Sequence, residues 1–146
     1  MKIKTFIVLI MLVPLIALAK PQVIEELEAP KGIGEQIEYF ATLYGTDSNL
    51  IKKVIECESD GDVSAVGDGG LSKGIGQFQK ATFKELSKKM GEELDYNSSY
   101  DQIKLMTWSI ANGYGRRWTA YRAIQNGGTY SFYSSQLKRH FTVSCK

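Results

Sequence analysis

A glycine-rich stretch that interrupts a helical pattern constrains this sequence most strongly. Apolar residues recur every three or four positions in residues 33–44 and 50–58 before it, and in residues 82–90 and 98–112 after it. This spacing predicts amphipathic helices that each bury one face. In residues 60–76 the period is lost and glycines recur, which predicts a loop or a small irregular hairpin. A mainly helical domain is therefore expected.

Capping residues place the ends of these helices. Gly45 is expected to end the first helix, and one of residues 46–48 (Thr, Asp, Ser) is expected to cap the second. Thr82 is the expected cap of the third helix. Further along, a short helix is predicted around residues 118–124 and a last helix from about residue 130 to residue 140.

The first residues have the order of a cleaved export signal. Two lysines precede an apolar run that ends in Ala-Leu-Ala, and this run is shorter than the ~20 residues that a membrane-spanning helix needs. We therefore expect a signal peptide in residues 1–19, with an uncleaved anchor as the alternative. A proline- and glutamate-containing spacer in residues 20–32 and a single domain in residues 33–146 follow.

Charge and cysteine content narrow the expected partners. A net charge of +2 gives no reason to expect a nucleic-acid partner. Cys57 and Cys145 are expected in a compartment where disulfides persist. A bridge between them and two separate thiols remain as alternatives.

Metal sites are disfavoured by the residues present. A single histidine, His140, disfavours zinc, and the stretch from Asp60 lacks the glycine and the final glutamate of a calcium loop. No metal and no cofactor is expected.

Helical spacing separates two glutamates at the end of the second predicted helix. Glu58 lies four residues after Val54 and seven after Ile51, so it continues the buried face. Glu56 lies four residues after Lys52 on the polar face, where we expect it to pair with that lysine. A carboxyl group among apolar neighbours has a raised pKa and can donate a proton near neutral pH. Glu58 is therefore a candidate catalytic acid, with a purely structural glutamate as the alternative.

The residues around Glu58 resemble a known family. Glu58-Ser59 closes a helix, a glycine-rich loop follows, and residues 74–78 read Gly-Ile-Gly-Gln-Phe. This combination resembles the soluble lytic transglycosylase domain, a branch of the lysozyme-like superfamily, over residues 33–124. The resemblance implies a mainly α (α+β, lysozyme-like) fold with the glycine-rich loop or a small irregular hairpin beside a cleft. It also implies that Glu58 is the sole catalytic acid and base, that Gln77 lines the glycan groove and that Ser59 supports the site.

One departure from the family pattern concerns the end of the long helix. The family usually shows Tyr-Asn-Ala-Gly there, whereas residues 110–115 read Ile-Ala-Asn-Gly-Tyr-Gly, so the tyrosine that supports the glutamate is displaced. We expect Tyr114 or Tyr121 to replace it. Asn112 is the expected polar groove residue, with a plain helix-end role as the alternative.

A second departure lies in the loop. Gly67 stands where a groove serine is usual, and Ser72 is expected to serve instead. Asp68 is the only loop acid that the sequence places well for chemistry. If Asp68 faces Glu58, it can activate water and give a hydrolysed product, as in goose-type lysozymes. If it does not, Glu58 must act as both acid and base.

The expected substrate is therefore the glycan strand of peptidoglycan. The resemblance implies cleavage of the β-1,4 bond between N-acetylmuramic acid and N-acetylglucosamine, without water and with a 1,6-anhydromuramyl product. Hydrolysis of the goose-lysozyme type and a catalytically inactive glycan-binding module are the alternatives. The protein is expected to be exported, periplasmic or extracellular and associated with the cell wall, with no membrane attachment after signal cleavage. A partner in a secretion or conjugation machine is a further hypothesis that shares the same chemistry.

Overall fold

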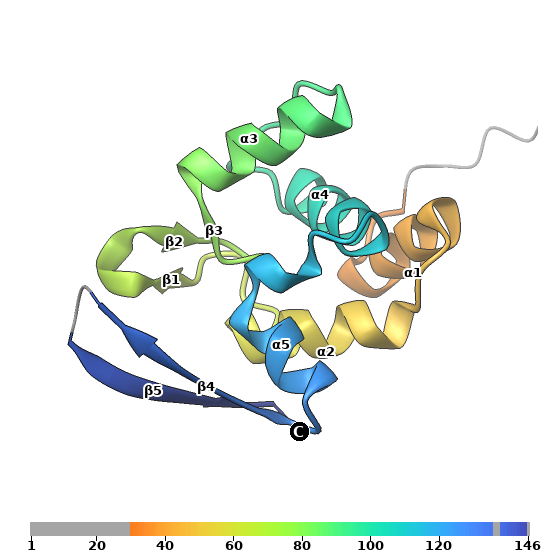
Figure 1. Cartoon of the computed structure of the whole chain (residues 1–146). Helices are drawn as coiled ribbons and strands as arrows, with labels where there is room; N and C mark the ends of the chain where they lie inside the picture. The colour runs from red at the N-terminus through yellow and green to blue at the C-terminus, as the bar shows by residue number, and fades with distance from the viewer. Residues whose placement is uncertain (1–29, 136–137, 146) are drawn as a thin grey trace, which may run out of the picture.

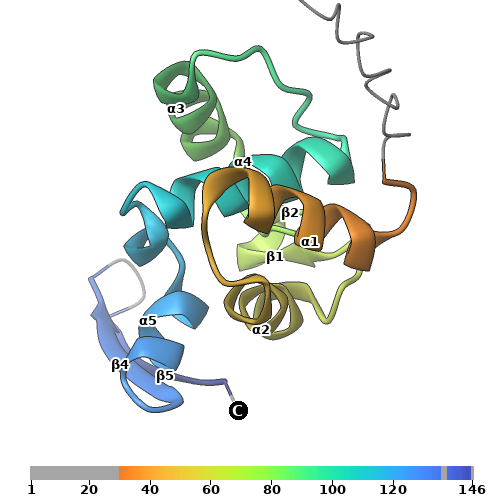
Figure 2. The same ribbon diagram turned by 90° about the vertical axis from the view of Figure 1, so that its right-hand side faces the viewer.

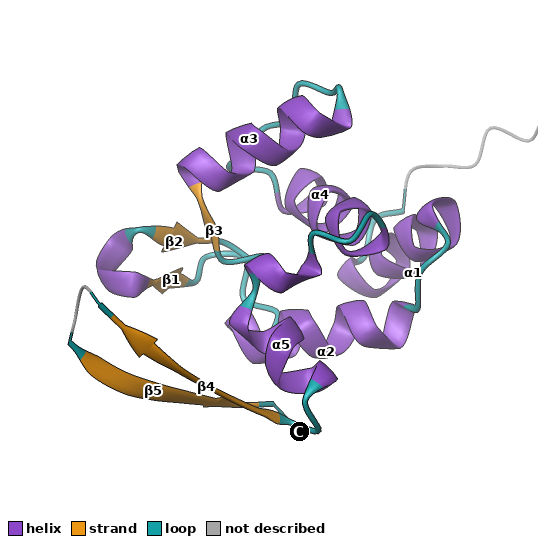
Figure 3. Cartoon of the chain, viewed as in Figure 1, coloured by secondary structure: helices purple, strands orange, loops and turns teal. Residues whose placement is uncertain are grey.

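The computed structural model describes residues 30–135 and 138–145, which fold into five α-helices and two small sheets (Figure 1). The predicted signal peptide and most of the predicted spacer lie outside the described residues. Three short strands lie between the second and third α-helices, and two longer strands follow the last α-helix (Figure 3). In order the helices (α), 3-10 turns (η) and strands (β) are α1 (Ile33–Tyr44), α2 (Ser48–Ser59), β1 (Val66–Gly67), η1 (Asp68–Gly70), β2 (Ser72–Lys73), β3 (Phe78–Gln79), α3 (Lys80–Met90), α4 (Ser99–Ala111), η2 (Gly115–Arg117), α5 (Thr119–Gln125), β4 (Thr129–Ser134) and β5 (Arg139–Ser144).

The helix ends follow the capping chemistry of the sequence in most places. Gly45 ends α1 in the left-handed conformation, with φ 68°. Asp47 caps α2, and its carboxylate accepts a hydrogen bond of 2.9 Å from the backbone N–H of Asn49. The prediction for Thr82 was wrong, because α3 already begins at Lys80. The backbone of β3 leads directly into that helix, so no side-chain cap precedes it.

Much of the hydrophobic core lies where α1 packs against α2 and α4, and Figure 2 shows α1 beside both of these helices. Ile51 and Val54 of α2 are fully buried, as their spacing predicts. Leu105 and Met106 of α4 are fully buried in the same hydrophobic cluster, and α1 packs against both α2 and α4. The core therefore holds the end of α2 in a fixed place. Within the described residues, no helix is long and apolar enough to span a membrane.

The glycine-rich stretch forms the small hairpin that was predicted as an alternative to a loop. A third strand, β3, extends this hairpin into a small sheet. β1 pairs with β2 and β2 with β3, all antiparallel. Each strand has two residues, so the sheet holds its shape mainly through the side-chain contacts described below. The sheet lies next to the end of α2, on the side of the molecule away from α1 (Figure 1).

The C-terminal segment is an antiparallel hairpin, so the predicted last helix was wrong. Phe132 of β4 lies directly opposite Phe141 of β5. The segments TYSFYS and RHFTVS are rich in aromatic and β-branched residues, which favour a pleated surface over a helix. Half-buried and exposed residues also alternate along β4, which is the two-residue period of a strand.

A disulfide joins Cys57 of α2 to Cys145, directly after β5. The bond resolves the choice that the sequence left open, and its Cα–Cα distance of 5.7 Å lies in the usual range. It fixes the base of the hairpin to the residue next to Glu58. The backbone N–H of Cys145 also donates to the carbonyl of Gly128, 2.8 Å away, which closes the hairpin at its base.

Candidate active site

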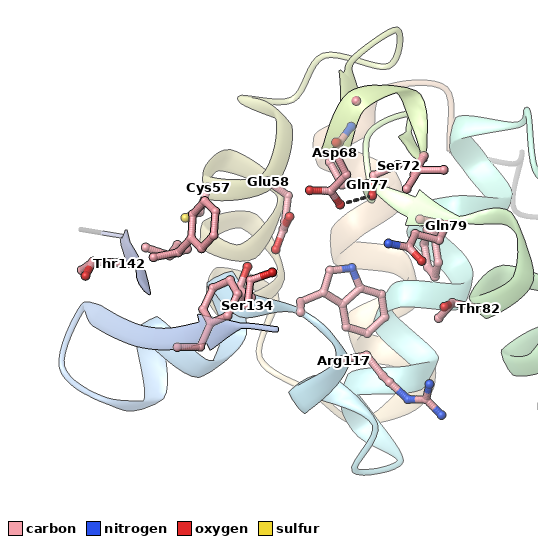
Figure 4. A pocket seen from close by; sticks show the side chains of 18 residues that line it. Cys57, Glu58, Asp68, Ser72, Gln77, Gln79, Thr82, Arg117, Ser134 and Thr142 are labelled. Carbon is pink, nitrogen blue, oxygen red and sulfur yellow. Dashed lines mark hydrogen bonds between the residues drawn. The ribbon is translucent and has the colours of Figure 1, made fainter. Parts of the chain in front are cut away.

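A cleft of about 930 Å³ opens where α2, the β1–β3 sheet, α5 and the β4–β5 hairpin meet. Figure 4 shows Glu58 between the loop that carries Asp68 and the hairpin strand that carries Ser134. The walls therefore come from segments far apart in the sequence. The lining residues used below are Glu58, Asp68, Leu71, Ser72, Gln77, Gln79, Trp118, Phe132, Phe141 and Val143.

Glu58 is the more buried of the two carboxylates that line this cleft, and its surroundings change its pKa. Burial raises the pKa of Glu58 to about 7, the backbone N–H of Ala120 lowers that pKa, and the charge of Asp68 raises it. The N–H of Ala120 donates to Oε1 of Glu58 at 3.2 Å. A carboxyl group with a pKa near neutrality can both give and accept a proton there.

Glu56 behaves as a surface residue, although its expected partner was wrong. Its side chain is exposed on the polar face of α2. Lys52 forms its ion pair with Glu38 of α1 instead, with 2.5 Å between Nζ and Oε1. The two faces of α2 therefore separate Glu56 from Glu58 as the helical period predicts.

Ser59 links the end of α2 to the glycine-rich stretch. Its hydroxyl donates to the carbonyl of Ile75, 2.8 Å away. Ile75 is fully buried, so this bond anchors the loop to the core beside Glu58. Ser59 is not among the residues that line the cleft, and its position is that of a supporting residue.

Asp68 and Ser72 form one polar wall of the cleft. The hydroxyl of Ser72 donates to Oδ2 of Asp68 at 2.6 Å (Figure 4). Asp68 is exposed and has a positive φ of 49°, a conformation that aspartate tolerates better than most residues. Ser72 is buried, so the hydrogen bond holds the Asp68 carboxylate in place on the same cleft as Glu58.

Gln77 lines the cleft, but its amide N–H groups are used inside the loop. Nε2 donates to the carbonyls of Ala65, at 3.2 Å, and Gly74, at 2.9 Å. A Cβ atom on Gly67 would lie 2.2 Å from Oε1 of Gln77. Gly67 is therefore the residue that leaves room for the Gln77 amide, which explains why no serine stands there.

Asn112 and the two candidate tyrosines are not brought to the cleft. Asn112 is exposed at the end of α4, where its Nδ2 donates to the carbonyl of Trp108 at 2.8 Å. It has the helix-end role that was the alternative. Tyr114 stacks on Trp108 at 5.8 Å, and Tyr121 packs its ring against Gly115. The support that a tyrosine was expected to give Glu58 comes instead from the Ala120 N–H.

The sequence did not predict the hydrogen bonds by which two residues support the loop. Gln102 of α4 is buried, accepts from the N–H of Gly76 at 3.0 Å and donates to the carbonyl of Tyr96 at 2.8 Å. Trp118 is also buried, and its Nε1 donates to the carbonyl of Gly76 at 2.9 Å. The signal for Gln102 was a polar residue inside the apolar face of a long helix. Such a residue needs a buried hydrogen-bonding partner.

The hairpin wall of the cleft was also missed. Phe132 and Phe141 line the cleft from the hairpin, and Figure 4 shows a hairpin strand, labelled at Ser134, on the other side of Glu58 from Asp68. A helix in residues 130–140 does not bring these two rings together, so the wrong element hid them. In the part of the chain that the structure describes, no group of three or more His, Cys, Asp or Glu side chains is placed to hold a metal ion.

Comparison with known families identifies the domain. A family model described as the transglycosylase SLT domain matches residues 35–129, more than half of the chain. The chain therefore belongs to this family, and the fold is the mainly α, lysozyme-like fold that the resemblance implied. Membership supports peptidoglycan lytic transglycosylase activity in general. No match was found among curated proteins or among solved structures.

Proposed function

We propose that this domain cleaves the β-1,4 bond between N-acetylmuramic acid and N-acetylglucosamine in peptidoglycan, with Glu58 as its one acid and base. One observation carries the proposal. Glu58 lies in a cleft, and burial raises the pKa of its carboxyl group to about 7. A group of this kind is protonated in a useful fraction of molecules near neutral pH. Membership of the transglycosylase SLT family supports the substrate class.

In the first step the protonated carboxyl of Glu58 gives its proton to the oxygen that bridges the two sugars. The C1–O bond of the muramyl residue breaks, and positive charge develops at C1. The acetamido group of the same sugar stabilises this centre through its carbonyl oxygen. Glu58 is left as a carboxylate, which the N–H of Ala120 stabilises by its hydrogen bond.

In the second step the Glu58 carboxylate removes the proton from the 6-hydroxyl of the muramyl residue. The freed oxygen forms a bond to C1 and closes a 1,6-anhydro ring, so no water is consumed. Glu58 returns to its protonated form, ready for another turnover. The raised pKa favours this return, because the proton is held more tightly than by an ordinary glutamate.

Hydrolysis is the second candidate, and the position of Asp68 favours it. Asp68 lines the same cleft, and its negative charge raises the pKa of Glu58, so the two carboxylates lie near each other. A second carboxylate in a glycosidase site can activate water for attack at C1. In the transglycosylase mechanism Asp68 has no chemical step and acts only on the pKa of Glu58.

Product masses from digested peptidoglycan distinguish the two reactions. We expect anhydro products from the parent protein and from Asp68→Asn, because the 6-hydroxyl attacks in both. Products heavier by one water, with loss of activity in Asp68→Asn, would instead assign hydrolysis. Asp62→Asn is the matched control, since Asp62 is exposed in the same loop and its carboxylate accepts hydrogen bonds from the backbone N–H and the hydroxyl of Ser64, away from Glu58.

The proposed substrate requires export, because peptidoglycan lies outside the cytoplasmic membrane. We infer that residues 1–19 act as a cleaved signal peptide, on the strength of their charged, apolar and small-residue order. Analysis of the N-terminus of the exported protein tests this inference. A mature chain that begins near Lys20 is the expected result, and an intact N-terminus in the membrane fraction would contradict it.

A further inference from the structure

The C-terminal hairpin adds a wall to the cleft that the family match does not include. The match ends at residue 129, where β4 begins. The base of the hairpin is held to α2 by the disulfide between Cys57 and Cys145, directly beside Glu58. β4 and β5 also pack against α5, whose backbone contacts the Glu58 carboxylate. The hairpin therefore has a fixed position relative to the reacting group.

Two rings on this hairpin face the cleft rather than the core. Phe132 and Phe141 are cross-strand partners, with ring centroids 5.6 Å apart and ring planes 18° apart. Both are half-buried and line the cleft. Among the described residues, Tyr130 and Val143 at the base of the same face pack on the hydrophobic core, but the two phenylalanines do not. Core packing therefore does not explain where these rings lie.

A pairing role within the hairpin explains only part of the arrangement. Stacked aromatic residues at a cross-strand position stabilise a hairpin on either of its faces. Tyr133 and His140 form a cross-strand pair on the opposite face, tilted rather than stacked, with centroids 5.1 Å apart. The phenylalanine pair differs because it lines the same cleft as Glu58 and Asp68.

The two walls have the chemistry of an amphipathic ligand. A pyranose ring has an apolar face of C–H groups and a polar rim of hydroxyls. Aromatic rings that are partly open to solvent can stack on the apolar face. The Asp68 carboxylate and the Ser72 hydroxyl of the other wall can form hydrogen bonds with the hydroxyls of the rim. Arg139 packs on one of these rings, with its guanidinium carbon 4.5 Å from the centroid of Phe141.

We propose that Phe132 and Phe141 form a sugar-binding subsite, in which they stack on the apolar face of an N-acetylhexosamine ring next to the scissile bond. This inference rests on the proposed function, since it assigns a wall of the same cleft to the same glycan strand. The rings hold the strand against Glu58 and take no part in proton transfer.

The test is binding to purified insoluble peptidoglycan, measured by cosedimentation in a Glu58→Gln background so that the ligand is not consumed. We expect Phe132→Ala and Phe141→Ala each to weaken binding by about tenfold, which corresponds to about 1.4 kcal/mol. Tyr133→Ala is the matched control, because Tyr133 lies on the other face of the same strand and is 55% exposed. Its binding should equal that of the background protein.

A second pair of variants separates stacking from folding. Phe141→Leu keeps an apolar side chain and should still bind about tenfold more weakly, whereas Phe141→Tyr keeps the ring and should bind normally. Unchanged binding in both Phe132→Ala and Phe141→Leu, equal loss in Tyr133→Ala, or no binding by the background protein would each overturn the subsite.

A separate measurement tests the proposed function. It follows the release of soluble fragments from peptidoglycan by the protein that retains Glu58. Release of fragments together with unchanged binding in the phenylalanine variants would reject the subsite and leave the catalytic proposal standing. Absence of release, with the tenfold binding differences still present, would reject catalysis and support the subsite.

Discussion

The carboxylate of Glu58 accepts a hydrogen bond of 3.2 Å from the backbone N–H of Ala120, 62 residues further along the chain. Burial favours the protonated carboxyl, and this bond favours the carboxylate. The two effects oppose each other, and burial is the larger. Because the donor is a backbone group, no side chain at residue 120 is needed to provide it. The domain thus supports its glutamate without the tyrosine that the family usually places there.

The rate of glycan cleavage should fall as pH rises through about 7. Above it, kcat/KM should fall by about tenfold per pH unit. In Asp68→Asn the pH at which kcat/KM begins to fall should be lower, because the charge of Asp68 raises the pKa of Glu58. Initial rates of peptidoglycan solubilisation across pH 5–9 would check this, and a rate that rises through pH 7 would contradict it.

Glu58→Gln should make the folded protein more stable at high pH. The pKa of Glu58 is higher in the folded state than its ordinary 4.5, so its protonation stabilises the fold fully below about pH 4.5. That stabilisation is lost as pH rises through about 7, and glutamine does not lose it. We expect the gain in the free energy of unfolding to grow with pH and to reach roughly 1–3 kcal/mol at pH 8. Urea unfolding at pH 4.5 and 8 measures the gain, and equal gains at the two pH values would argue against a raised pKa.

Gly67→Ser should damage the site although serine is usual at this place in the family. A Cβ atom there would lie 2.2 Å from Oε1 of Gln77, so the Gln77 amide must move and lose its bonds to Ala65 and Gly74. We expect a loss of about 1–3 kcal/mol in stability, measured by urea unfolding, together with slower cleavage.

A glycine with free space around it provides the control for this substitution. Gly34 lies in α1 with no atom within 4 Å of an added Cβ, so Gly34→Ala should be neutral or stabilising by roughly 0.5–1 kcal/mol. A Gly67→Ser protein as stable and as active as the parent would show that the Gln77 amide is free to reorient.

Loss of the disulfide should destabilise the domain and loosen the hairpin. The bond between Cys57 and Cys145 spans 88 residues, and removing a native disulfide commonly costs about 2–5 kcal/mol. We expect the double variant Cys57→Ser/Cys145→Ser to melt at a lower temperature and to bind peptidoglycan more weakly. Dithiothreitol should lower the melting temperature of the parent and leave that of the double variant unchanged. A parent protein that is insensitive to the reductant would contradict a stabilising disulfide.

The helices and Glu58 could be predicted from the sequence because both depend on local periodicity. A buried face repeats every three or four residues along α1, α2 and α4, and Glu58 continues one such face. The small hairpin was also predictable as an alternative to a loop, since glycines favour the turns it needs. These features require no knowledge of which distant segments meet.

The parts that sequence reasoning missed depend on contacts between distant segments. The Ala120 N–H has no side-chain signature, and the disulfide required the geometry of two segments 88 residues apart. Residues 130–140 were assigned to a helix because a glycine pair before them suggested a helix boundary. The two-residue alternation of β4 is short, and it becomes decisive only when Phe132 faces Phe141 across the hairpin.

Asn112 shows the limit of carrying family roles across by sequence position. It lies in the segment where the family has a groove asparagine, but its side chain is bonded to the end of its own helix. Gln77 kept its place on the cleft, while its amide donors serve the loop. Position along the chain therefore predicted location better than it predicted chemical role.

The most direct test of the central role of Glu58 compares purified parent protein and Glu58→Gln in the release of soluble fragments from peptidoglycan near pH 6. The substitution keeps the size of the side chain and an oxygen that can accept from Ala120, but removes the transferable proton. We predict a fall in rate of about 10²–10⁴-fold with peptidoglycan binding and the folded structure retained. Release by Glu58→Gln at the parental rate, or no release by the parent protein itself, would contradict a catalytic role for this carboxyl group.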